Sequence, residues 1–143
     1  MRIIALMVIM AGILLSTYNQ LQAEEVKMEK INILKEIPYR DGGMGKRTLV
    51  NEDYLLVMQA ALKPGQMVPQ HNADSNVRII SIRGEVVVDL AGEKIKAAEG
   101  DIVPATPGTP MNITNQSEED ATFLIIKTPH PRMMKQRSGC GMK

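Results

Sequence analysis

The chain has 143 residues, with 17 basic and 16 acidic side chains, one Phe and no Trp. This length is typical of a single domain. The nearly balanced charge argues against the clustered positive surface that phosphate binding needs, so we expect no nucleic-acid partner. The scarcity of aromatic side chains leaves little with which to stack on bases or sugars.

Residues 1–23 have the pattern of a secretory signal peptide. Arg2 gives a positive start, and the apolar run 3–15 follows it. As a helix this run would span only about 20 Å, short of the roughly 30 Å hydrocarbon core of a membrane. Ala23 is a small residue at a suitable cleavage point. We therefore expect export to the periplasm or the extracellular space, and no integral membrane segment after cleavage.

The rest of the chain is predicted to be all-β. Short apolar runs rich in β-branched residues alternate with turn residues, and no stretch of ten or more residues shows a convincing helical period. In chain order, the predicted strands are 30–35, 48–50, 54–62, 77–82, 85–90, 94–98, 102–104, 111–114 and 122–127. Many short strands with glycine at most corners fit a single jelly-roll β-barrel over residues 24–128. The basic, Met- and Gly-containing tail, residues 129–143, is expected to be flexible.

Two separated motifs give residues 30–127 a resemblance to the cupin family. The first cupin motif runs from a glycine through two histidines two residues apart to a glutamate and a second glycine. Gly65 and Gly84 match the glycines, and His71 matches the first histidine. The framework of the second motif is matched by Gly100-Asp101, Pro107-Gly108, Pro110 and Asn115. The resemblance implies a small single-domain cupin, whose barrel is a jelly roll.

The chain departs from the cupin pattern at the metal ligands. Ala73 stands at the second histidine, Val77 at the glutamate and Met111 at the histidine of the second motif. Catalytic cupins usually present three imidazoles and one carboxylate to a divalent metal. One imidazole and a thioether are a poor replacement for iron, manganese or zinc. We therefore expect no cofactor at the barrel site, and a single divalent metal at an unorthodox site is the alternative.

His71 is the best candidate for a catalytic residue. It could act as a general acid or base near neutral pH, or it could be a polar remnant that lines a pocket. The candidate ligand-binding residues are Gln70, His71, Arg78 and Met111. Arg78 faces the interior only if the strand carries one extra residue after Ala73, whereas the family spacing buries Val77 instead. An inward Arg beside His71 would favour a carboxylate or phosphate ligand.

The tail supports a separate metal hypothesis. Its imidazole, thioether and thiol side chains are His130, Met133, Met134, Cys140 and Met142. Soft ligands of this kind suit Cu(I). The alternative is that a basic, Gly-containing terminus is simply disordered. Cys140 is the only cysteine, so it is either a free thiol or pairs with another chain.

Two classes of function remain open. The first is a non-catalytic module that binds a small ligand or a partner protein, favoured by the retained framework and the missing ligands. The alternative is an isomerase, lyase or oxidoreductase that uses His71 as acid or base, or an unorthodox metal site. A closed interior lined by Met and Val would favour the module, and a polar cluster around His71 would favour the enzyme. The resemblance also leaves a homodimer open, since small cupins often pair through an edge sheet.

Overall fold

The structure of the protein is a computed structural model in which residues 30–139 are described. The predicted signal peptide lies outside this range, as do Cys140 and Met142. The strands are β1 (Gly45–Asn51), β2 (Leu56–Leu62), β3 (Met67–Asn72), β4 (Asn76–Arg83), β5 (Val86–Leu90), β6 (Glu93–Ala97), β7 (Ile102–Ala105), β8 (Pro110–Thr114) and β9 (Ala121–Thr128), and the helix is α2 (Pro131–Gly139). Between residues 30 and 139, no helix is long and apolar enough to cross a membrane.

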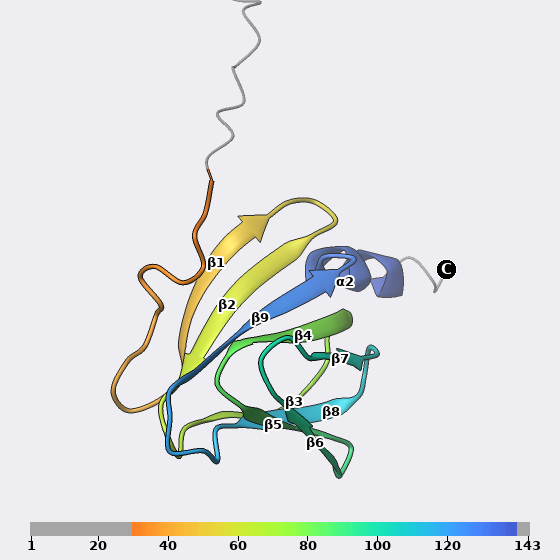
Figure 1. Ribbon diagram of the computed structural model, residues 1–143. Helices are drawn as coiled ribbons and strands as arrows, with labels where there is room; N and C mark the ends of the chain where they lie inside the picture. Colours follow the sequence, from red (N-terminus) through yellow and green to blue (C-terminus); the bar gives the residue numbers. More distant parts are fainter. Residues whose placement is uncertain (1–29, 140–143) are drawn as a thin grey trace, which may run out of the picture. The chain divides into compact units, whose positions relative to one another are not determined.

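The strands form two antiparallel sheets that face each other (Figure 1). The five-stranded sheet has the order β1-β2-β9-β4-β7, and the four-stranded sheet has the order β3-β8-β5-β6. Strands far apart in the sequence are neighbours, as β2 and β9 are, because the chain crosses repeatedly between the sheets. This is the connectivity of a jelly roll, and it confirms the predicted all-β fold.

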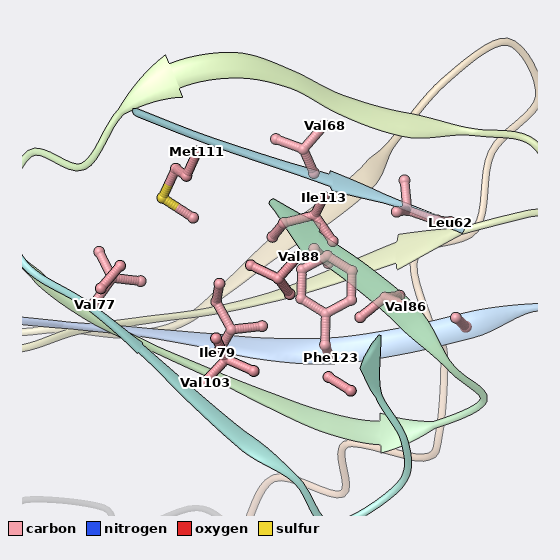
Figure 2. Close-up of a cluster of buried hydrophobic side chains, with 14 of the residues drawn as sticks. Leu62, Val68, Val77, Ile79, Val86, Val88, Val103, Met111, Ile113 and Phe123 are labelled. Carbon is pink, nitrogen blue, oxygen red and sulfur yellow. The ribbon is translucent and has the colours of Figure 1, made fainter. Parts of the chain in front are cut away.

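A hydrophobic core fills the space between the two sheets (Figure 2). Phe123 on β9 is the largest fully buried side chain, and Ile79 and Val88 lie close to it. Each such side chain stabilises the fold by about 1.5–3 kcal/mol relative to an exposed one. At one end of the cluster, Val77 and Met111 point toward each other from opposite sheets. This end of the core borders a pocket.

The strand that carries His71 was missed by the sequence analysis. Residues 67–72 form β3, at the edge of the four-stranded sheet. Pro69 and the polar residues beside it conceal the strand pattern. Proline is tolerated there because an edge strand leaves one row of N–H groups without a partner in the sheet.

The strand predicted at residues 30–35 is wrong, because this segment forms turns and bends. A buried polar network holds it against the side of β2 that faces away from the core. Gln59, with 0% of its surface exposed, donates from Nε2 to the Ile33 carbonyl at 2.7 Å and to Thr122 Oγ1 at 3.0 Å. Its Oε1 accepts a hydrogen bond from Arg47 Nε at 2.9 Å. Hydrogen bonds to side chains, and not to a neighbouring strand, therefore hold residues 30–35 in place.

The Gln59→Leu substitution is expected to lower the free energy of unfolding by about 2–3 kcal/mol, because the Ile33 carbonyl and the Arg47 guanidinium lose a buried partner. The matched control is Ser75→Ala. The Ser75 hydroxyl is fully buried and has no hydrogen-bond partner among the described residues, so its loss is expected to change stability by less than about 1 kcal/mol. Urea denaturation measures both changes, and equal losses would contradict the role given to the network.

Within the tail that was predicted to be flexible, residues 131–139 form α2. The flexibility of the tail stays a prediction. Pro131 occupies the first helical turn. A backbone N–H there has no acceptor within the helix, so the lack of an N–H in proline costs no hydrogen bond. Arg132 Nη2 donates to Asp53 Oδ1 at 3.1 Å, which joins the start of α2 to the turn between β1 and β2. The short helix was not recognised because its residues are mostly polar and show no strong apolar period.

Candidate functional site

A pocket of about 180 Å³ lies between the sheets at the end of the core marked by Val77 and Met111 (Figure 2). We call it the barrel pocket. Eight of its lining residues are apolar, and they include the three methionines Met44, Met58 and Met111. The other three are Lys46, His71 and Lys127, so every polar side chain of the lining carries nitrogen and none carries a carboxylate.

An irregularity in β3 turns His71 into this pocket. Val68 pairs with Ile113 and His71 pairs with Met111. A step of three residues along β3 therefore matches a step of two residues along β8. The extra residue forms a bulge, and both the buried Val68 and the exposed His71 border the pocket. His71 Nδ1 contacts the Pro69 carbonyl at 2.9 Å. A carbonyl oxygen only accepts, so Nδ1 is the donor in this contact.

The three positions at which the sequence lacks the cupin ligands meet in the barrel pocket. Ala73, Val77 and Met111 are 5%, 1% and 3% exposed, and all three line the pocket together with His71. The motif spacing therefore placed these positions around one site, although they come from β4, β8 and the segment after β3.

Two of the predicted ligand-binding residues lie outside the barrel pocket. Val77 faces the core, so Arg78 lies on the opposite side of β4, where it is exposed and donates from Nη1 to the Val77 carbonyl at 2.9 Å. The strand thus has the register in which Val77 is buried. Gln70 is also exposed and borders a separate open depression beside Asp89 and Asn112. Of the four predicted residues, only His71 and Met111 line the barrel pocket.

Two lysines of the site were missed by the sequence analysis. Lys46 on β1 pairs with the core residue Ala60, and Lys127 on β9 pairs with Val77, so both start from the inner faces of their strands. Lys127 Nζ lies 2.8 and 3.0 Å from the carboxylate oxygens of Asp74, and its side chain is only 13% exposed. Lys46 is exposed and has no hydrogen bond or ion pair through its side chain to another described residue.

A sequence signal existed for one of these lysines. Phe123 and Lys127 are four residues apart on β9, so a strand that buries Phe123 must turn Lys127 to the same side. No comparable signal pointed to Lys46, because the predicted strand began at residue 48 and excluded it.

The loop before β1 brings Met44 to the mouth of the pocket. Lys63 Nζ donates to Asp41 Oδ1 at 2.7 Å, and Gln66 Nε2 donates to the Arg40 carbonyl at 3.1 Å. The hydrogen bond from Lys63 lowers the pKa of the Asp41 carboxyl, and the same hydrogen bond raises the pKa of Lys63. These contacts tie the loop to the turn between β2 and β3, which positions Met44.

The residues of the tail copper hypothesis are only partly described. His130 Nε2 contacts Asn51 Oδ1 at 3.1 Å, and His130 Nδ1 accepts from the Arg132 N–H at 3.2 Å. Met133 and Met134 follow on α2. The remaining residues of this set lie beyond residue 139. An imidazole coordinates a metal through one nitrogen, so His130 would have to give up one of these two contacts to bind copper. The hypothesis stays a prediction.

The fold and its pocket define the class of protein, a small jelly-roll barrel with a cavity at one end. The cupin domain family matches residues 58–127. An uncharacterised protein of Methanocaldococcus jannaschii, MJ0764, is 31% identical over 87 residues, which cover 60% of this chain and 75% of that protein. The chain therefore belongs to the cupin superfamily, as its motifs predict.

Solved structures support the same assignment. The crystal structure of MJ0764, an RmlC-like cupin with a double-stranded β-helix fold, has a TM-score of 0.65 at 25% identity, covering 76% of this chain and 97% of that one. TT1209 from Thermus thermophilus gives 0.67 at 27% identity, covering 71% and 98%. A double-stranded β-helix protein from Klebsiella pneumoniae gives 0.66 at 19% identity, covering 72% and 91%, and shows the fold alone.

The residues of the barrel pocket do not fit the divalent metal that catalytic cupins hold. The lining offers one imidazole, His71, and neutral thioethers, with no carboxylate. No group of three or more His, Cys, Asp or Glu within residues 30–139 could hold a metal ion. Zinc and iron sites generally require three or four nitrogen, oxygen or thiolate ligands. The ammonium of Lys46, which has no ion-pair partner within residues 30–139, would also repel a cation.

Proposed function

We propose that this cupin is an exported module that binds a small ligand in the barrel pocket, without a metal and without catalysing a reaction. The observation that carries the proposal is the lining of the pocket, which combines eight apolar residues with three nitrogen-bearing side chains. Apolar walls with a few convergent polar groups are the usual form of a small-molecule site. Export is supported by the signal-peptide pattern of residues 1–23.

The size of the pocket limits the ligand. The pocket has a volume of about 180 Å³. Sites for drug-sized molecules are larger, about 300–1,000 Å³. The ligand, or the part of it that enters the barrel, is therefore a small molecule or a short side chain.

The test is an NMR screen of small acids, alcohols, amines and amides against the isotope-labelled protein, with EDTA present throughout. Ligands are expected to shift the amide signals of Ala73, Val77 and Met111. Ala73→Phe is expected to abolish binding because the ring occupies the pocket. Arg78→Phe is the matched control, since it adds the same ring on the opposite side of β4 and is expected to leave binding unchanged. The amide spectra also report whether each variant is folded.

Two results of this screen would contradict the proposal. One is that no compound of the library binds. The other is that binding persists in a folded Ala73→Phe variant, because the ligand would then bind outside the barrel pocket.

An enzyme remains the second candidate, and one observation favours it. The imidazole of His71 and the ammonium of Lys46 belong to the lining of the same pocket, and an imidazole can act as a general acid or base. A bound ligand that is converted during prolonged incubation, with conversion lost in His71→Gln, would establish this alternative. A ligand recovered unchanged from the same incubation supports the binding module.

A further inference from the structure

We propose that the ligand of the barrel pocket is a small monocarboxylate with an aliphatic body, whose carboxylate is bound by Lys46. This inference rests on the proposed function and specifies the chemistry of its ligand.

The charges around the pocket favour an anion. Its titratable lining residues are Lys46, His71 and Lys127, and the described residues place no acidic side chain in the lining. The carboxylate of Asp74 contacts Lys127 with both oxygens and compensates its charge. The ammonium of Lys46 has no such partner among the described residues, so one positive charge at the pocket is unbalanced.

The number of unbalanced charges points to a singly charged group. A phosphate monoester carries about −1.5 to −2 at neutral pH and is usually recognised by clustered arginines. The nearby Arg78 lies on the other side of β4 and cannot contribute to the pocket. A single lysine matches a single carboxylate, and a charge-assisted hydrogen bond between them is stronger than a neutral one.

The remaining lining indicates what the carboxylate is attached to. Met44, Met58 and Met111 line the pocket together with branched aliphatic side chains such as Ile125. Methionine is unbranched and adapts its shape to an aliphatic chain. No aromatic side chain belongs to the lining, so an aromatic ligand would find no ring on which to stack. A chain of a few methylenes suits both this surface and the volume of about 180 Å³.

The experiment titrates the full-length mature protein with hexanoate, 1-hexanol and hexylamine, which share an aliphatic chain and differ in their polar group. Binding is measured by NMR or by calorimetry. We expect hexanoate to bind at least about 10-fold more tightly than hexanol, because only the acid forms the charge-assisted contact, and we expect hexylamine to bind most weakly.

Lys46→Gln is expected to weaken hexanoate binding by about 10-fold and to leave hexanol binding unchanged. Lys94→Gln is the matched control, since Lys94 is an exposed lysine on β6 outside the pocket, and it is expected to change neither affinity. The same loss of hexanoate affinity in both variants would indicate a general charge effect and would overturn the role of Lys46.

The outcomes separate this inference from the proposed function. If hexanol binds as tightly as hexanoate, or if Lys46→Gln has no effect, the carboxylate assignment is wrong while the binding pocket stands. If neither the hexyl series nor any compound of the wider screen binds, the proposed function itself fails. Tight hexanoate binding that depends on Lys46 and disappears in Ala73→Phe supports both.

Discussion

Restoring the missing ligands with Ala73→His, Val77→Glu and Met111→His is expected to give the protein stoichiometric binding of a divalent metal. All three positions line the barrel pocket with His71. Residue 111 is the direct cross-strand partner of His71, and such pairs have Cβ atoms about 4.5–5.5 Å apart. The variant would offer three imidazoles and one carboxylate, enough ligands for zinc or iron. We expect a Kd of about 1 μM or tighter, or about 8 kcal/mol.

Equilibrium dialysis against zinc, with elemental analysis of the protein, measures this gain. The register control carries Arg78→Glu in place of Val77→Glu, so that its carboxylate lies on the opposite side of β4 and is expected to bind zinc at least 10-fold more weakly. Polar groups at three buried positions destabilise the metal-free triple variant, so its melting temperature should rise when metal is added. A folded triple variant with no gain in affinity would show that these positions do not converge as described.

Gly45→Ala is expected to destabilise the domain by more than about 2 kcal/mol. Gly45 is buried at the start of β1, where it pairs with Ala61 of β2. A Cβ atom at this position would overlap the carbonyl of Pro38. That carbonyl belongs to the backbone and cannot rotate aside as a flexible side chain could. Either the segment before β1 or the first pair of the β1–β2 ladder must therefore move.

Gly108→Ala provides the comparison for this steric effect. Gly108 has a φ of +84°, and a Cβ there would meet nothing within 4 Å. Its substitution is expected to cost only the strain of the left-handed backbone, about 1–2 kcal/mol. Urea denaturation of both variants measures the difference in their free energies of unfolding. The slopes of the unfolding free energy against urea concentration are compared between the two variants. A Gly45→Ala variant as stable as Gly108→Ala would contradict the close approach of Pro38.

Much of the fold could be predicted from local sequence features. Strand periodicity and turn residues predicted most of the strands, because both depend on neighbouring residues alone. The cupin motifs placed Ala73, Val77 and Met111 around one site before any contact was known. The errors came where another part of the molecule overrides the local pattern. Residues 30–35 alternate like a strand, yet the buried Gln59 binds this segment in another conformation.

The sequence by itself determined the family, the missing metal ligands and the position of His71 and Met111 in the site. Only the tertiary structure decided the unbalanced charge of the barrel pocket, because Lys46 reaches it from β1 through long-range strand pairing. It also decided that Arg78 faces away. A shift of one residue in register moves every side chain of a strand to the opposite face, and register depends on bulges and partners distant in the sequence.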